Sequence, residues 1–236
     1  MLLFSVFNRP ERFRIFLKRF VEEVDKIGIQ SIGIVALLSI FMGAVITIQT
    51  ASQIESGLIP SYTIGFSTRQ IMILEFAPTI IPVILAGKIG SNIASELGSM
   101  RITEQIDAID IMGINSANYL ILPKITASLF IFPFLIVMSM FLGVAAGGIL
   151  GHFTGVVSFP EFEYGIQYDF RTFHVAYGLI KTVVFAFIIT TVSSFYGYYV
   201  KGGALEVGKA STQAVVYSIV LIMTFNVIIT QMLLLK

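Results

Sequence analysis

Lys88, Asn92 and Glu96 stand four residues apart in the segment GKIGSNIASELGSMRITEQIDAIDIMG, which covers residues 87–113. Residues at i, i+4 and i+8 share one face of a helix, where these three can form a polar network or bind a charged group. Two other interpretations remain open, because Lys88 can extend its ammonium group to the membrane surface and Glu96 can simply be solvated there.

Glu75 lies in an apolar stretch thirteen residues before Lys88, or about 20 Å away along a helix. An ionisable group inside a membrane segment is costly unless it faces protein or water, so it indicates a functional site. It either lines a cavity that accepts a polar lipid headgroup or hydrogen-bonds within a packed bundle. The candidates for the lipid cavity are Glu75, Lys88, Gln49 and Gln53.

The composition indicates that the protein which positions these groups is a membrane protein. Hydrophobic residues make up 56% of the 236 residues and charged residues 12%, whereas about a quarter of a globular chain is charged. The sequence predicts one all-α integral membrane domain over residues 1–236. The predicted spans cover 27–54, 70–96, 119–153, 173–200 and 210–235.

Other classes are disfavoured by composition. No cysteine is present, which excludes disulfides, thiolate metal sites and a cysteine nucleophile, and two histidines are too few for an obvious metal site. The net charge of +1 gives no reason to propose nucleic acid. No secretory signal is expected, since the N-terminal basic residues follow the first short apolar run.

The segment 10–24 is both basic and amphipathic. Phe13, Phe16, Leu17 and Phe20 recur at helical spacing beside arginine and lysine side chains. This pattern is typical of an interfacial helix in the headgroup plane, although a basic flank that anchors the next span would share the location. Most lysine and arginine residues fall on one side of the predicted spans, which places the N-terminus in the cytoplasm and the C-terminus outside.

Prolines, glycines and short polar stretches divide the spans. Pro78 and Pro82 are expected to kink or open the second span. Residues 55–69 and 160–171 are expected to be loops, the latter acidic. Rows of small residues at every fourth position predict close helix packing: Gly90, Ala94 and Gly98 in the second span, and Gly143, Gly147 and Gly151 in the third.

The segment 103–113 reads as a short separate helix on the cytoplasmic side. Thr103 is the predicted N-cap, Glu104 and Asp107 lie near the positive end of the helix dipole, and Gly113 suits a left-handed stop. Such a short helix is marginal in water and must dock on something. Its predicted apolar edge comprises Ile102, Ile106, Ile109 and Met112.

The run AGKIGSNIASELGSMRITEQIDAIDIMGI (residues 86–114), followed by YLILPK (119–124), resembles the signature of the MlaE/YrbE family of ABC-transporter permeases. Two positions depart from that pattern: Lys88 stands where arginine is common, and Ser116 stands where a proline often follows an acidic residue. The resemblance covers nearly the whole chain, including the order of a basic interfacial helix and five spans.

The resemblance implies a homodimer with a lipid cavity between the two copies. A bacterial inner membrane is expected because the sequence shows no transit peptide. The resemblance also implies a cytoplasmic ATPase that binds ATP and Mg, an MCE-domain lipid-binding protein outside the membrane, and phospholipid or a related lipid as substrate. The segment 103–113 matches the coupling helix that sits on the ATPase. The residues carried over to that coupling role are Glu96, Arg101, Thr103, Glu104, Gln105, Asp107, Met112 and Gly113.

Two other functions compete with this expectation. A gradient-driven transporter would use Glu75 and Lys88 as a polar relay and would need no ATPase. A membrane-embedded enzyme would use His152 or His174, but both lie at span ends, where interfacial roles are commoner. No GxxxxGK[ST] loop and no HExxH motif occur, so we expect a non-catalytic subunit whose ATP is hydrolysed by a partner.

Overall fold

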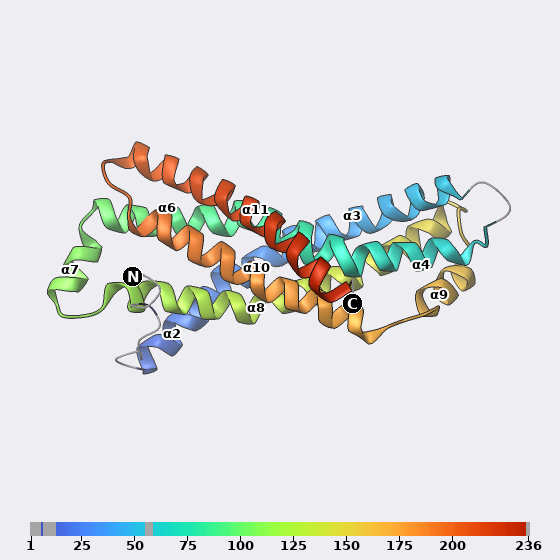
Figure 1. The fold of residues 1–236 in the computed structure, drawn as a ribbon, viewed down its shortest axis with the longest axis horizontal. Coiled ribbons are helices and arrows are strands. Elements are labelled where there is room, and N and C mark those ends of the chain that lie inside the picture. Colours follow the sequence, from blue (N-terminus) through green and yellow to red (C-terminus); the bar gives the residue numbers. More distant parts are fainter. Residues whose placement is uncertain (1–5, 7–12, 55–58, 235–236) are drawn as a thin grey trace. The chain divides into compact units, whose positions relative to one another are not determined.

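The computed structural model describes residues 6, 13–54 and 59–234, and within these residues it contains helices and turns but no β-strand. Five helical stretches of this part of the chain are long and apolar enough to cross a membrane (Figure 1). They are Phe13–Gln53, Tyr62–Ile102, Ser116–Phe153, Thr172–Tyr198 and Ala204–Leu234. The chain is therefore an all-α integral membrane protein, as the sequence predicted.

The first stretch unites two elements that are separate in the sequence prediction. α2 (Phe13–Val24) continues through the π-helical turn η1 (Asp25–Ile29) into α3 (Gln30–Gln53). The predicted boundary between an interfacial helix over 10–24 and a span over 27–54 is thus a widened turn and not a break, and residues 10–12 lie outside the described part. α2 is amphipathic, with Phe13, Leu17 and Val21 exposed.

The second stretch begins earlier and ends later than the predicted span over 70–96. It consists of α4 (Tyr62–Ile71), η2 (Met72–Ile80), α5 (Ile81–Leu85), η3 (Ala86–Gly90) and α6 (Ser91–Ile102). Pro60 and Ser61 accept the first backbone hydrogen bonds, so the predicted loop over 55–69 ends there. Pro78 lies inside the π-helical segment η2. A π-helical segment is one way in which a helix accommodates a disturbed hydrogen-bond ladder.

The remaining spans are α8 (Ser116–Phe153), α10 (Thr172–Tyr198) and α11 (Ala204–Leu234), close to the predicted 119–153, 173–200 and 210–235. Between α8 and α10 the predicted acidic loop contains a helix, α9 (Phe159–Gln167), which corrects the sequence prediction. The side chain of Glu161 accepts hydrogen bonds from the Ser158 backbone N–H at 3.3 Å and hydroxyl at 2.6 Å. The Ser-x-x-Glu spacing was the signal for this helix start.

The helices form two compact units. Unit 1 comprises the described residues of Met1–Ser31, Pro82–Phe132 and Val183–Lys236, and unit 2 comprises those of Ile32–Ile81 and Pro133–Thr182. In unit 1, α6 packs against α11. A Cβ on Gly90 would lie 2.8 Å from Ser193 Oγ, and one on Gly98 would lie 3.0 Å from Val207 Cγ1. A Cβ on Gly197 of α10 would lie 2.9 Å from the Ala94 Cα, so this small-residue row does meet neighbouring helices.

In unit 2, the glycine row of α8 faces α3 and its neighbours. A Cβ on Gly43 would overlap the backbone of Gly143, and one on Gly147 would lie 3.0 Å from the Gly43 carbonyl oxygen. At Gly151 it would lie 3.0 Å from Thr47 Cγ2. Such backbone approach is the arrangement that small residues permit in membrane helices.

A buried arginine holds α9 and the segment after it in unit 2. The Arg69 guanidinium donates hydrogen bonds to the backbone carbonyls of Ile166 at 2.6 Å, Tyr168 at 3.0 Å and Asp169 at 3.4 Å. The residue is 2% exposed, and its charge lies near the rings of Phe66 and Phe170. These contacts attach the segment between α8 and α10 to α4, on which α9 also packs.

Candidate transport site and coupling segment

In unit 2, Glu75 forms an ion pair with Lys181. The Lys181 ammonium lies 3.2 Å from Glu75 Oε1 and also donates to the Leu74 carbonyl and the Tyr177 hydroxyl, each at 3.2 Å. Thr79 Oγ1 donates to Glu75 Oε2 at 3.1 Å. Glu75 therefore contacts both its own helix and α10.

The two sides of this pair differ in exposure. The Lys181 side chain is 0% exposed, whereas that of Glu75 is 47% exposed. A buried ammonium group needs an opposite charge, which Glu75 supplies. Gly178 allows the approach of α10, since a Cβ there would lie 3.2 Å from the Ile73 carbonyl oxygen. The arrangement can present one carboxylate at the surface of unit 2 while keeping the cation inside.

Lys181 is not among the residues predicted for the site from the sequence. The signal was present, since Lys181 stands inside the predicted span 173–200 and Tyr177 precedes it by one helical turn. An ionisable residue in such a place calls for a named partner. The partner lies 106 residues away along the chain, so spacing alone could not identify it.

The other predicted cavity residues are distributed over both units. Gln49 and Gln53 are exposed on α3 in unit 2, and Lys88 belongs to unit 1. Lys88 donates to the Gln30 carbonyl oxygen and, at 3.2 Å, to the Ser31 hydroxyl. A cavity of about 420 Å³ in unit 2 is lined mainly by apolar residues of α3, α4 and the adjoining loops, not by Gln49 or Gln53.

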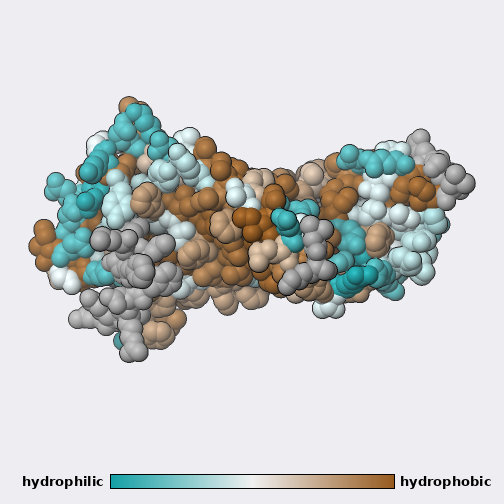
Figure 2. Space-filling model, in the orientation of Figure 1, coloured by the Kyte–Doolittle hydropathy of each residue, from teal (hydrophilic) through white to brown (hydrophobic). Residues whose placement is uncertain are grey.

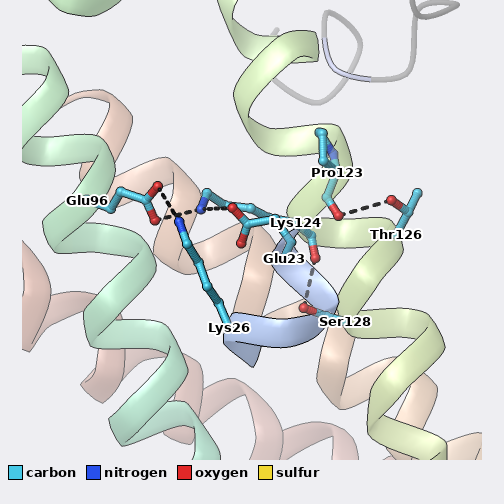
Figure 3. Close-up of polar contacts among 7 residues, drawn as sticks. All are labelled: Glu23, Lys26, Glu96, Pro123, Lys124, Thr126 and Ser128. Atoms are coloured by element: carbon cyan, nitrogen blue, oxygen red, sulfur yellow. Dashed lines mark hydrogen bonds and ion pairs between the residues drawn. The ribbon is translucent and has the colours of Figure 1, made fainter. Parts of the chain in front are cut away.

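In unit 1, a second buried lysine contacts carboxylates of two other helices (Figure 3). The Lys124 ammonium donates to Glu23 Oε1 and to Glu96 Oε2, each at 2.7 Å, and Lys26 lies 3.6 Å from Glu96 Oε1. We refer to Glu23, Lys26, Glu96 and Lys124 as the Lys124 cluster. It joins α2 and η1 to α6 and α8, and it places Glu96 in an internal network beside the predicted coupling segment.

The segment after α6 folds into the predicted short helix, with one correction. α7 covers Gln105–Ile111, and Thr103 is not its N-cap. Thr103 instead ends α6, where its hydroxyl donates to the Ser99 carbonyl at 2.8 Å. Glu104 occupies the N-cap position with a left-handed φ of 60°. A threonine hydroxyl can bond backwards to residue i−4, which competed here with capping the next helix.

Side chains on both sides of the turn fix α7 in place. Arg101 Nη1 and Asp107 Oδ1 form an ion pair at 2.6 Å, and Asp110 Oδ1 accepts the Ser116 backbone N–H at 3.2 Å. Gly113 has the predicted left-handed conformation, with a φ of +79°. The joint between α6, α7 and α8 is therefore built from specific contacts on each side.

The apolar edge of α7 is divided between the interior and the surface. Ile106 is 0% exposed, whereas Ile111 is 87% and Met112 66% exposed. Glu104 and Gln105 are also exposed. Figure 2 shows hydrophilic residues gathered over the end of unit 1 that carries α7 and the start of α11. Ile111 and Met112 thus form an apolar tip in polar surroundings.

The comparison with known families identifies the chain. Residues 20–232 match the family model described as Permease MlaE. The chain belongs to the MlaE permease family. This MlaE-family permease is 32% identical to a probable ABC transporter permease protein of Rickettsia bellii, over 97% of the chain and 86% of that protein. The family assignment agrees with the resemblance found in the motif around residues 86–124.

Two further relatives come from photosynthetic organisms. The MlaE-family permease is 32% identical to a probable ABC transporter permease protein of Synechocystis, over 94% of the chain and 84% of the relative. It is 31% identical to the Arabidopsis thaliana chloroplast protein named TRIGALACTOSYLDIACYLGLYCEROL 1, over 88% of the chain and 59% of that protein. Together with the five spans, these relatives make the chain a multi-pass membrane permease.

Proposed function

We propose that this permease is the membrane subunit of an ABC transporter that moves phospholipid or a related lipid. Two copies form the transport unit in a bacterial inner membrane, with the N-terminus cytoplasmic and the C-terminus periplasmic. A separate cytoplasmic ATPase binds ATP and Mg, and a periplasmic MCE-domain protein exchanges lipid with the permease. Membership of the MlaE family and the ABC-permease names of its relatives support this assembly.

The exposed apolar tip of α7 is the observation that carries the ATPase assignment. A helix of seven residues does not stay folded alone, yet contacts such as the ion pair between Arg101 and Asp107 hold this one against unit 1. Contiguous exposed apolar surface rimmed by polar residues is typical of docking surfaces, and the adjacent Ile111 and Met112 provide such a surface. Ile111 and Met112 therefore provide an anchor for a cytoplasmic partner, and α6 leads from that anchor directly into the span.

The lipid assignment is supported by the Glu75–Lys181 pair and by one relative. Glu75 presents a half-exposed carboxylate on a membrane helix, where Ile71, one turn earlier, is 43% exposed. A charged group beside apolar surface suits an amphipathic substrate. The name of the Arabidopsis thaliana relative contains that of a glycerolipid, which points to the same substrate class.

The ATPase assignment is tested by co-purifying the permease with its co-expressed ATPase subunit. Ile111→Asp places a charge in the proposed interface and should reduce recovered ATPase and lipid-stimulated ATP hydrolysis at least tenfold. The matched control is Phe153→Asp, which alters an 80% exposed side chain at the far end of α8. Undiminished ATPase recovery and ATP hydrolysis in the Ile111→Asp complex would refute the coupling role of α7.

The lipid assignment is tested by crosslinking from a photoreactive residue at position 71 in the assembled transporter. Lipid adducts should change in amount when ATP is added and should respond to Glu75→Gln. A photoreactive residue at Phe141, 72% exposed in the same unit, reports ordinary contact with bulk lipid. Equal labelling at both positions, unaffected by ATP and by Glu75→Gln, would count against a transport site at Glu75.

The gradient-driven alternative receives less support from the contacts. Glu75 pairs with Lys181 in unit 2, whereas Lys88 bonds to Gln30 and Ser31 in unit 1. ATP-independent lipid transfer driven by a proton or sodium gradient in vesicles would favour this alternative over the ABC transporter.

A further inference from the structure

Unit 1 contains a polar cavity beside the Lys124 cluster, at the junction of η1, η3, α6 and α8. Its volume of about 340 Å³ falls within the range of roughly 300–1,000 Å³ typical of small-molecule sites. From Lys88 to Glu96 its wall follows two turns of helix, or about 12 Å. The polar part of the lining comprises Glu23, Lys26, Gln30, Lys88, Asn92, Glu96 and Lys124.

The charges around this cavity do not balance. Lys124 contacts both carboxylates of the cluster, and Glu96 also faces Lys26. Lys88, in contrast, bonds only to the neutral oxygens of Gln30 and Ser31, and no carboxylate of the described residues lies within ion-pair distance of it. Three lysines therefore face two glutamates, and the unmatched positive charge is at Lys88.

A second hydrogen-bond donor lies beside that charge. Asn92 follows Lys88 by one helical turn and is exposed. Its side chain makes no hydrogen bond within the described part of the chain. An ammonium group and an amide on the same wall can both donate to one anion. A phosphate diester suits this pair, because its two non-bridging oxygens can accept from both donors at once.

The surroundings of the cavity favour an anion that carries acyl chains. Ile27, Ile89 and Ile93 form the apolar part of its wall. Ile29, on the π-helical turn η1 that also carries Lys26 and Ile27, is 58% exposed. α2 leads into this turn with an amphipathic surface suited to the headgroup plane. An apolar surface therefore continues from the cavity towards the expected lipid region.

We propose that this cavity is a binding site for the phosphate of a membrane phospholipid, held by Lys88 and Asn92, with its acyl chains along Ile27 and Ile29. The inference deepens the proposed lipid transport and rests on it for the identity of the ligand. It assigns unit 1 a headgroup site in addition to the Glu75–Lys181 pair of unit 2. The carboxylates of the cluster are engaged by lysines, so the site selects the phosphate and not the headgroup amine.

The test uses the complete transporter in nanodiscs of phosphatidylethanolamine and phosphatidylglycerol. A photoreactive residue replaces Gln30, which is exposed at the cavity, and the nanodiscs contain phosphorus-32-labelled phospholipid. We expect a labelled adduct that falls at least about tenfold in Lys88→Met, as for the loss of one hydrogen bond to a charged group, and that persists in Lys88→Arg. Unchanged labelling in Lys88→Met would overturn the proposal.

Asn92→Leu provides a second variant, because it removes a donor without removing any hydrogen bond seen in the structure. It should also reduce the adduct severalfold, and unchanged labelling would contradict the role of Asn92. The matched control Lys209→Met removes an exposed lysine that pairs with Glu206 and should leave labelling intact. Size-exclusion profiles and melting temperatures show that each variant is folded.

Two further arms separate the possible sources of the anion. Excess inorganic phosphate should not compete with the adduct if the acyl chains contribute, and full competition would indicate a free-phosphate site instead. Tritiated diacylglycerol should label poorly, whereas labelling equal to that of phospholipid would overturn phosphate recognition. Crosslinking here needs neither ATP nor the ATPase, so a negative result with intact ATP-driven lipid transfer would refute this site alone.

Discussion

Lys181 and Glu75 form an ion pair at 3.2 Å in which the lysine side chain is completely buried and the glutamate side chain is half exposed. Lys181 therefore depends on Glu75 for a counter-charge, because the buried ammonium has no access to water that could solvate it. Removing one partner has a different effect from removing both.

Glu75→Gln should destabilise unit 2 more than the double change Glu75→Gln with Lys181→Met. The single variant leaves a buried ammonium without its counter-charge, and we expect a coupling energy of about 1–3 kcal/mol between the two positions. Thermal or detergent unfolding of all four proteins of the cycle gives this value. Additive effects of the two substitutions would show that the contact contributes nothing to stability.

Lys124→Met should be among the more destabilising single substitutions in unit 1. It leaves Glu23 and Glu96 without the ammonium that both contact at 2.7 Å, and loss of a buried partner costs about 3–5 kcal/mol. Lys209→Met is the control, since its pair with Glu206 is exposed and such pairs contribute only about 0–1 kcal/mol. Similar melting temperatures for the two variants would contradict the importance of the cluster.

Gly43→Ala should weaken unit 2, because the added methyl group would overlap the backbone of Gly143. Overpacking of this kind costs about 1–3 kcal/mol or more. Gly33→Ala on the same helix is the control, as nothing lies within 4 Å of the position that its added methyl group would take; there we expect no loss, and a gain of up to about 1 kcal/mol from helix propensity. Melting curves in detergent distinguish these outcomes, and equal stability of the two variants would contradict close contact between α3 and α8.

Glu104→Gly should stabilise the turn between α6 and α7. Glu104 has a left-handed φ of 60°, which costs a side-chain-bearing residue about 1–2 kcal/mol relative to glycine. Glu104→Val should act in the opposite direction, because β-branched residues tolerate this conformation least. Hydrogen exchange of the α7 amides measures the change. Faster exchange in Glu104→Gly than in the parent protein would show that the glutamate side chain stabilises the turn in another way.

Local sequence patterns predicted the spans and the short helix well. Apolar length identified five membrane helices, and Gly113 marked the end of α7 because a left-handed residue favours glycine. Local competition explains the misplaced start, since Thr103 could cap either helix and its hydroxyl bonds back to Ser99. The helix α9 was missed because an acidic, proline-containing segment resembles a loop, although Ser158 and Glu161 carried the capping signal.

The polar contacts of the candidate sites were less predictable. Glu75 and Glu96 stand out in the sequence because charges in apolar segments are conspicuous. Their partners could not be inferred in the same way, since Lys181 and Lys124 come from other helices, 106 and 28 residues away. Helical spacing reports which residues share a face, but it carries no information about the helix that the face meets.

The contacts of Arg69 determine how the sequence of the segment between α8 and α10 can vary among related proteins. Its hydrogen-bond acceptors at residues 166, 168 and 169 are backbone carbonyls, which every amino acid provides. Substitutions at those three positions can therefore preserve the attachment of this segment as long as the backbone keeps its path. Arginine itself cannot be exchanged for lysine without losing the planar fork that reaches several acceptors. The attachment thus depends on the arginine side chain alone, while the amino-acid sequence of the segment that it holds can change.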